Sequence, residues 1–169
     1  MRARVKVQAR LFRLQRAWPG VLWRLHRRLG EPVCPRERGV VITVSLRRRE
    51  LRLYEDGELC ASYRVGVGGL RGRTPQGRFE IGAKVRHPAW TVPDIPERYG
   101  ELAGRVIPGG APGNRLGEVW LELYGAIGIH GAPGGRLGLG STDGCITMSP
   151  VDLRALSERV TVGTPVHIG

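Results

Sequence analysis

The sequence predicts a mostly β domain in which short strands form a sandwich or a barrel-like sheet. Glycine and proline are abundant, with 26 and 12 among 169 residues, which favours a loop-rich β architecture over a helix bundle. Short β-branched runs are separated by turn residues. A clear helix start is found only near the C-terminal end. We therefore expect strands first and a late helix.

Seven segments have the composition or alternation of strands. They are residues 40–46, 51–54, 59–67, 77–83, 118–124, 126–129 and 164–168. Asp56-Gly57 lies between the second and third segments, and Asp-Gly is a strong signal for a tight hairpin turn. The first strands are therefore expected to pair as a hairpin.

The late helix is expected to start after Ser149. Ser149 suits the N-cap, Pro150 the first helical position, and Asp152 the first turn. The expected buried stripe consists of Val151, Leu153, Ala155, Leu156 and Val160.

The domain is expected to span residues 39–169, preceded by a basic arm over residues 1–38. Residues 1–39 hold 11 basic and 2 acidic side chains. Leucines at steps of three and four alternate with arginines, although Pro19-Gly20 should kink a helix. The arm is either an amphipathic helix on an anionic membrane surface or a partly disordered extension. No transmembrane helix, clear signal peptide or nucleic-acid motif is found, so no nucleic-acid partner is expected.

The cysteines are Cys34, Cys60 and Cys145, and an odd number predicts at least one free thiol. A Cys34–Cys60 disulfide remains an open alternative. The spacing fits no metal site, and we expect no metal or cofactor.

The segment that carries chemistry runs from His130 to Cys145 and is rich in glycine. A neighbouring imidazole can accept the proton of a thiol, because the thiolate is the attacking form. Gly144 allows a tight turn before the cysteine and brings N–H groups close to a developing oxyanion. From these residues alone, a hydrolase, a transferase, or a buried structural cysteine with an incidental histidine all remain open.

Several motifs over residues 40–169 together resemble the L,D-transpeptidase catalytic domain (YkuD) family. In chain order they are Thr74-Pro75-Gln76-Gly77-Arg78-Phe79, His87-Pro88-Ala89-Trp90, Ile107-Pro108-Gly109-Gly110, Pro112-Gly113-Asn114-Arg115-Leu116-Gly117, Gly128-Ile129-His130-Gly131 and Thr142-Asp143-Gly144-Cys145-Ile146-Thr147-Met148. The closing helix and strand resemble the family through Asp152, Leu156 and Val162-Gly163-Thr164-Pro165-Val166.

The resemblance implies roles for individual residues. Cys145 is the implied nucleophile, His130 the proton donor and acceptor, and Gly131 the residue whose carbonyl orients the histidine. Backbone N–H groups of Gly144 and Cys145 are implied in the oxyanion hole. The implied substrates are peptidoglycan stem peptides outside the cytoplasmic membrane. D-Ala leaves, and an amine resolves the acyl-enzyme; resolution by water would make the protein an L,D-carboxypeptidase.

The sequence departs from the family pattern at two positions near the nucleophile. Asp143 replaces the usual histidine, and an acid there would repel a thiolate or alter the acceptor subsite. Thr147 replaces the usual arginine or asparagine, and Arg136 is a candidate substitute as carboxylate partner. We expect Thr142, Asp143, Arg136 and Thr147 to contact substrate. The departures also leave open a catalytically weakened wall-binding module.

Overall fold

A computed structural model describes residues 38–69, 72–132, 134 and 137–169. Almost all of the predicted arm over residues 1–38 lies outside the described residues, so its two alternatives stay predictions. Arg136 also lies outside them. Among the helices of the described part, none has the length and apolar content needed to cross a membrane.

Most strands of the described chain belong to one sheet of ten strands, which confirms the prediction of a mostly β fold. Its order is β4-β12-β1-β2-β3-β11-β9-β8-β5, with β10 paired to β3. The bounds are β1 Val40–Ser45, β2 Glu50–Glu55, β3 Glu58–Gly68, β4 Gly77–Glu80, β5 Ala83–Arg86, β8 Val119–Tyr124, β9 Ile127–Gly131, β10 Leu139–Thr142, β11 Ile146–Met148 and β12 Pro165–Ile168.

The sheet curls until its two edges are neighbours. The edge strands β4 and β5 are consecutive in the chain and are separated only by Ile81 and Gly82. At this junction Ile81 N–H donates to Thr164 O beside β12, and Gly82 N–H donates to Glu122 O of β8. The single strand predicted over residues 77–83 is therefore wrong, because the chain crosses from one edge to the other there.

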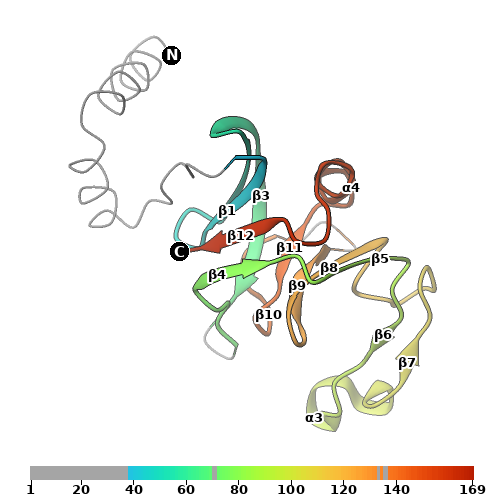
Figure 1. The fold of residues 1–169 in the computed structure, drawn as a ribbon. Coiled ribbons are helices and arrows are strands. Elements are labelled where there is room, and N and C mark those ends of the chain that lie inside the picture. The colour runs from blue at the N-terminus through green and yellow to red at the C-terminus, as the bar shows by residue number, and fades with distance from the viewer. Residues whose placement is uncertain (1–37, 70–71, 133, 135–136) are drawn as a thin grey trace.

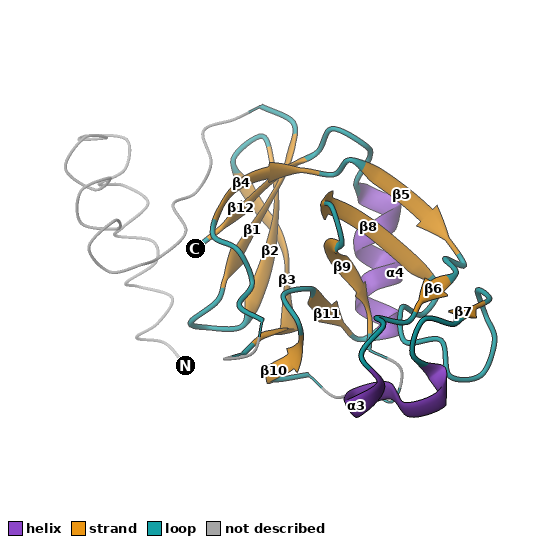
Figure 2. Cartoon of the chain, turned by 90° about the horizontal axis from the view of Figure 1, so that it is seen from below, coloured by secondary structure: helices purple, strands orange, loops and turns teal. Residues whose placement is uncertain are grey.

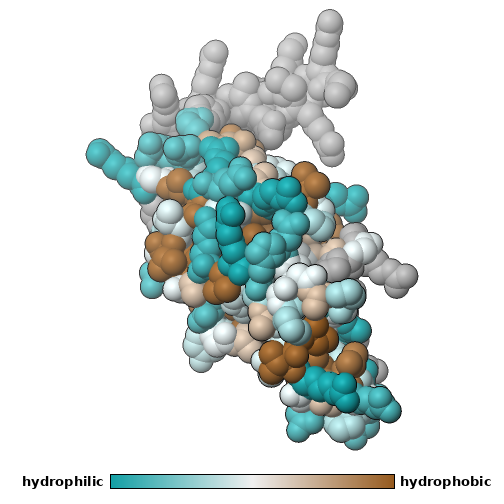
Figure 3. Space-filling view, turned by 90° about the vertical axis from the view of Figure 1, so that its right-hand side faces the viewer, coloured by the Kyte–Doolittle hydropathy of each residue, from teal (hydrophilic) through white to brown (hydrophobic). Residues whose placement is uncertain are grey.

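One helix and one small lobe are added to the curled sheet (Figures 1 and 2). Helix α4, Pro150–Arg159, packs against β8 and β9. The lobe consists of β6 Trp90–Thr91, α3 Pro96–Tyr99, η1 Gly100–Leu102 and β7 Val106–Ile107, and it projects from the sheet between β5 and β8. Apolar and polar side chains alternate over its surface (Figure 3), where Ile95, Leu102 and Val106 are exposed.

The β2–β3 hairpin closes as the sequence predicts. Asp56 and Gly57 both have positive φ, 50° and 84°, and Glu55 pairs with Glu58. Two successive left-handed residues match the twist of the flanking strands, which explains why Asp-Gly occupies this turn.

The core is one continuous cluster to which both halves of the sheet and α4 contribute. Its fully buried large side chains include Ile42, Leu51, Leu53, Leu121, Ile129, Ile146, Met148, Leu153 and Leu156. Because Ile129 and Ile146 belong to the strands next to the candidate site, the core fixes those strands from behind.

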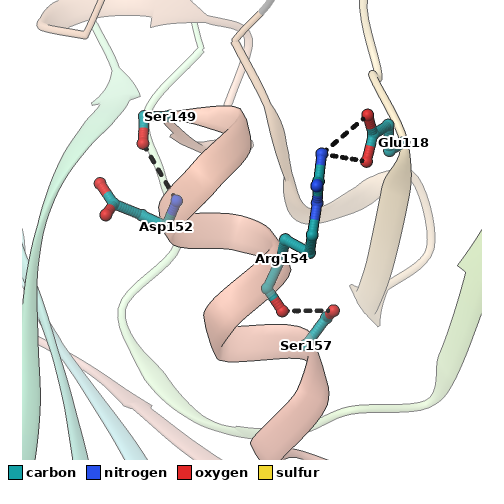
Figure 4. Close-up of polar contacts among 5 residues, drawn as sticks. All are labelled: Glu118, Ser149, Asp152, Arg154 and Ser157. Carbon is teal, nitrogen blue, oxygen red and sulfur yellow. Dashed lines mark hydrogen bonds and ion pairs between the residues drawn. The ribbon is translucent and has the colours of Figure 1, made fainter.

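Helix α4 has the predicted start but not the predicted stripe. Ser149 Oγ accepts a hydrogen bond from Asp152 N–H at 3.1 Å, and Pro150 is the first helical residue (Figure 4). The buried side chains are Leu153, Leu156 and Ser157, followed by Val160. Val151 and Ala155 are exposed, because the face toward β8 and β9 is defined by the spacing of Leu153, Leu156 and Val160.

Removing the helix cap tests this start. Ser149→Ala should lower the free energy of unfolding by about 1 kcal/mol, because it leaves the Asp152 N–H without its acceptor. Chemical denaturation measures the change. Glu158→Ala, at an exposed position of the same helix, is the control and should change stability by less than about 0.5 kcal/mol. Equal stability of both variants would contradict the capping role.

Candidate active site

The pairing of β9 with β11 brings Cys145 and His130 to the same face of the sheet. These strands are parallel, with Ile146 opposite Ile129 and Thr147 opposite His130. Cys145 directly precedes Ile146, so its side chain is on the face opposite Ile146, as is that of Thr147. Residues opposite each other in a parallel pair share a face. His130 therefore faces the same side as Cys145, and Ile129 and Ile146 face the core.

The turn before Cys145 depends on Gly144 and Thr142. Gly144 has φ +119°, and a Cβ there would lie 2.8 Å from Ile127 Cδ1. Thr142 Oγ1 donates to Cys145 O at 2.5 Å and accepts from Gly144 N–H at 3.4 Å. The threonine thus closes the turn around the cysteine backbone. Thr142 itself is half-buried.

Backbone groups also hold the thiol and the imidazole. Cys145 Sγ lies 3.4 Å from Ala126 O and can donate its proton to that carbonyl. His130 Nδ1 lies 2.8 Å from Gly131 O, the carbonyl that the resemblance implies as its orienter. His130 is 8% exposed, and its ring centroid lies 5.8 Å from that of Trp120, the residue opposite it on β8.

Burial favours the neutral forms of both groups. It lowers the pKa of His130, although backbone hydrogen bonds to Gly131 and Arg115 oppose this effect. Burial raises the pKa of the Cys145 thiol, and the charge of Asp143 raises it further, while a backbone hydrogen bond to Gly128 lowers it. Around neutral pH the resting pair is therefore a thiol beside an unprotonated imidazole that can act as a base.

Asp143 is paired with an arginine that the sequence did not indicate. Arg98 of α3 donates from Nη1 to Asp143 Oδ2. Both side chains are partly exposed. The ion pair joins the lobe to the turn that carries Cys145.

The segment before β4 packs by close backbone contact against the turn of Asp143 and Gly144, which precedes Cys145. A Cβ on Gly72 would lie 2.6 Å from Asp143 Cα, and one on Gly68 would lie 2.9 Å from Gly144 N. The buried Thr74 receives a hydrogen bond on Oγ1 from Gly68 N–H at 2.9 Å. Glycine is needed at both positions because a side chain would displace the turn.

Asn114 holds together the loops on the other side of the site. Its Nδ2 lies 2.8 Å from Pro88 O, 3.0 Å from Pro108 O and 3.2 Å from Ile107 O. Its Oδ1 accepts from Leu116 N–H at 2.8 Å. Leu116 O in turn accepts from Gly131 N–H at 2.9 Å. This buried amide thus positions the loop that supports the backbone beside His130.

A small pocket lies on the other side of β9, under the start of α4. Its volume is about 140 Å³, and its lining consists of Gly117, Glu118, Val119, Gly131, Pro150, Leu153 and Arg154. Arg154 forms an ion pair with Glu118 at 3.0 Å beside it (Figure 4). Neither Cys145 nor His130 lines this pocket, so we do not assign the chemistry to it.

The described residues offer no group of three or more side chains suited to hold a metal ion. Cys60 is a free, exposed thiol in this structure, so it forms no disulfide. Cys145 is the second free thiol of the described residues.

The structure brings Cys145, His130, Gly131, Gly144, Thr142, Asp143 and Thr147 together around the β9–β11 pair. Thr147 is 4% exposed and lies opposite His130. Asn114 belongs to one of the sequence motifs, but no role was predicted for its side chain; the available signal was an amide side chain between Gly113 and Gly117. No role was predicted for Arg98 or Trp120.

Comparison with known proteins places this domain in a family of transpeptidase catalytic domains. A family model described as the L,D-transpeptidase catalytic domain matches residues 39–168. The chain belongs to this family.

Two curated relatives agree with this assignment. The probable L,D-transpeptidase YcfS of Escherichia coli is 33% identical over 150 residues, covering 81% of this chain and 45% of that protein. YqjB of Bacillus subtilis, which also carries an L,D-transpeptidase name, is 30% identical over 149 residues, covering 83% of this chain and 76% of that protein. The chain therefore spans less than half the length of YcfS.

Solved structures show the same fold. An L,D-transpeptidase from Mycobacterium smegmatis superposes with a TM-score of 0.63 at 21% identity, covering 77% of this chain and 58% of that one. The catalytic domain of an E. faecium L,D-transpeptidase gives a TM-score of 0.60 at 20% identity, covering 80% of this chain and all of that domain.

A substitution at Gly144 tests the turn. Gly144→Ala should lower the free energy of unfolding by about 1–3 kcal/mol, because the alanine would have a disfavoured φ and its Cβ would contact Ile127. Alkylation of Cys145, followed by peptide mass spectrometry, should also slow. Gly138→Ala is the matched control, since a Cβ there has open space and an ordinary φ. The role of Gly144 is excluded if both variants behave alike.

Proposed function

We propose that this protein is a peptidoglycan L,D-transpeptidase whose nucleophile is Cys145. The observation that carries the proposal is that Cys145, directly before β11, faces the same side of the sheet as His130 on the neighbouring parallel strand β9, in a chain that belongs to the L,D-transpeptidase family. The proposed substrate is a tetrapeptide stem with a diamino acid in its third position. Such a substrate lies outside the cytoplasmic membrane, where we expect the protein to act.

The first half-reaction forms a thioester. The thiol of Cys145 leaves Ala126 O and turns toward His130, a side-chain rotation of the kind that substrate binding often completes. His130 accepts the proton while sulfur attacks the carbonyl of the third stem residue. Backbone N–H groups of Gly144 and Cys145 stabilise the oxyanion. The C–N bond to D-Ala then breaks, and His130 returns the proton to the leaving amine.

The second half-reaction resolves the thioester. An amine of another stem attacks the same carbonyl, His130 takes its proton, and the C–S bond breaks to regenerate the thiol. The product is a new amide between two stems. Water in place of the amine would give a shortened stem, so the acceptor alone separates a transpeptidase from an L,D-carboxypeptidase.

A covalent probe tests the nucleophile. Incubation with a carbapenem should add one carbapenem mass to the intact protein, because the thiolate opens the β-lactam ring and keeps all its atoms. Cys145→Ala should show no adduct, whereas Cys60→Ala should react as the unaltered protein does, since Cys60 lies exposed on β3. Absence of an adduct on folded, unaltered protein, together with no D-Ala release from tetrapeptide muropeptides, would refute the proposal. Product analysis then separates cross-linked dimers from trimmed tripeptides.

The pH dependence of acylation tests His130 as the base. Because burial lowers the pKa of His130 below its ordinary value of 6.5, the unprotonated base persists at that pH. The acid limb of the rate against pH should therefore fall below pH 6.5. Stopped-flow measurement of carbapenem acylation locates this limb. A limb above pH 6.5 would contradict a buried, neutral histidine as the base.

A further inference from the structure

Within the described part of the chain, the lobe between β5 and β8 reaches the turn before Cys145 through one ion pair. Arg98 on α3 pairs with Asp143, which is 45 positions later in the chain and two residues before Cys145. The lobe is otherwise connected to the sheet through loops, such as those held by Asn114. The position of Arg98 therefore bears directly on the surroundings of the thiol.

Aromatic side chains of the lobe hold this arginine in place. The guanidinium carbon of Arg98 lies 5.2 Å from the ring centroid of Tyr99, which contacts Trp90 edge-on at 6.0 Å. Arg115 lies over both rings, at 5.4 Å from Trp90 and 5.6 Å from Tyr99. Cation–π contacts of this kind orient a guanidinium without neutralising it. Arg98 therefore remains positively charged where it pairs with Asp143.

Asp143 alone would work against the proposed chemistry. Its negative charge raises the pKa of the Cys145 thiol and so reduces the fraction of thiolate. A positive charge paired with this carboxylate opposes its effect on the pKa of the thiol. The hydrogen bond that Arg98 donates to Asp143 raises the pKa of Arg98, so the guanidinium remains protonated under all conditions of interest.

We infer that Arg98 is a positioning residue for Cys145: by pairing with Asp143, it offsets the acid beside the nucleophile and keeps the thiol able to ionise. This inference rests on the proposed function only in taking Cys145 as the reactive thiol. Asp143 and Arg98 would then act as one neutral unit at a place where the family usually has a histidine.

The other charged or titratable groups around the thiol are few among the described residues. His130 faces it from β9, and Asp143 belongs to its own turn. Arg73, with an exposed side chain, belongs to the segment that packs against Gly144, and Tyr124 ends β8 next to the turn containing Ala126. Arg98 joins this group from α3 through Asp143.

The test is a double-mutant cycle read out as the pKa of Cys145. The full-length protein is alkylated with iodoacetamide across a pH series, and peptide mass spectrometry reports the rate at Cys145 alone. Arg98→Gln should raise the pKa by about one unit, a tenfold loss of thiolate below the pKa. Asp143→Asn should lower it. The double variant should be close to the unaltered protein, and Arg98→Lys should retain most of the effect.

Shifts of opposite sign in the pKa of Cys145 distinguish an electrostatic effect from a merely structural contact. Both single substitutions break the same ion pair, so detachment of the lobe would move the pKa in the same direction in both. Arg105→Gln removes an equal charge from an exposed position of the same lobe and should leave the pKa within about 0.2 unit of the unaltered protein, since a solvated, distant charge is screened. Shifts of the same sign, or no shift in folded Arg98→Gln, would overturn the inference.

The readout does not require a wall substrate. If the cycle gives opposite signs while the folded protein forms no carbapenem adduct and releases no D-Ala from tetrapeptide muropeptides, the proposed function is refuted and the role of Arg98 stands. If an adduct forms on Cys145 but Arg98→Gln leaves the pKa of Cys145 unchanged, the proposed function is supported and the role of Arg98 is refuted.

Discussion

The parallel pairing of β9 with β11 is the constraint on which the site depends. These two short strands place His130 opposite Thr147, and Cys145 lies two residues before Thr147 on the same face. A shift of one residue in this register would turn either the thiol or the imidazole into the core. Ile129 and Ile146, both fully buried, oppose such a shift because it would expose them. Hydrophobic burial on one face of the strands thus fixes the positions of His130 and Cys145 on the other face.

The surroundings of the strand pair are built mainly from backbone. Gly68 and Gly72 let neighbouring backbone approach more closely than any side chain would allow, and Gly117 and Gly144 pack closely against Gly131 and Ile127. Two buried polar side chains, Thr74 and Asn114, supply the hydrogen bonds that these turning segments lack. An unsatisfied buried backbone group is costly. The glycine-rich motifs of the sequence are therefore requirements of close packing around the nucleophile turn.

Local signals in the sequence predicted much of the fold, and long-range ones were missed. The Asp56-Gly57 turn, the cap at Ser149 and the β-branched strands follow from neighbouring residues, and each was predicted. The lobe, β10 and β11 consist of strands of two to four residues whose pairing partners are distant. Cys145 and His130 were predictable because motifs surround both. Arg98 was not, because its partner Asp143 is 45 positions away and no local pattern marks Arg98.

The exposed side chains of Val151 and Ala155 show that tertiary packing, and not helical periodicity alone, decides which residues of a helix are buried. Both residues fit an apolar stripe in the sequence, yet α4 is only ten residues long and turns Leu153 and Leu156 toward β8 and β9. Leu153 is the side chain that reaches Gly131, where a Cβ would lie 3.7 Å from its Cδ2. The helix therefore supports from behind the same backbone whose carbonyl orients His130. The core, helix α4 and the glycine-rich loops thus all help to position His130. The charge balance at Cys145 depends instead on the lobe, through Arg98 and Asp143.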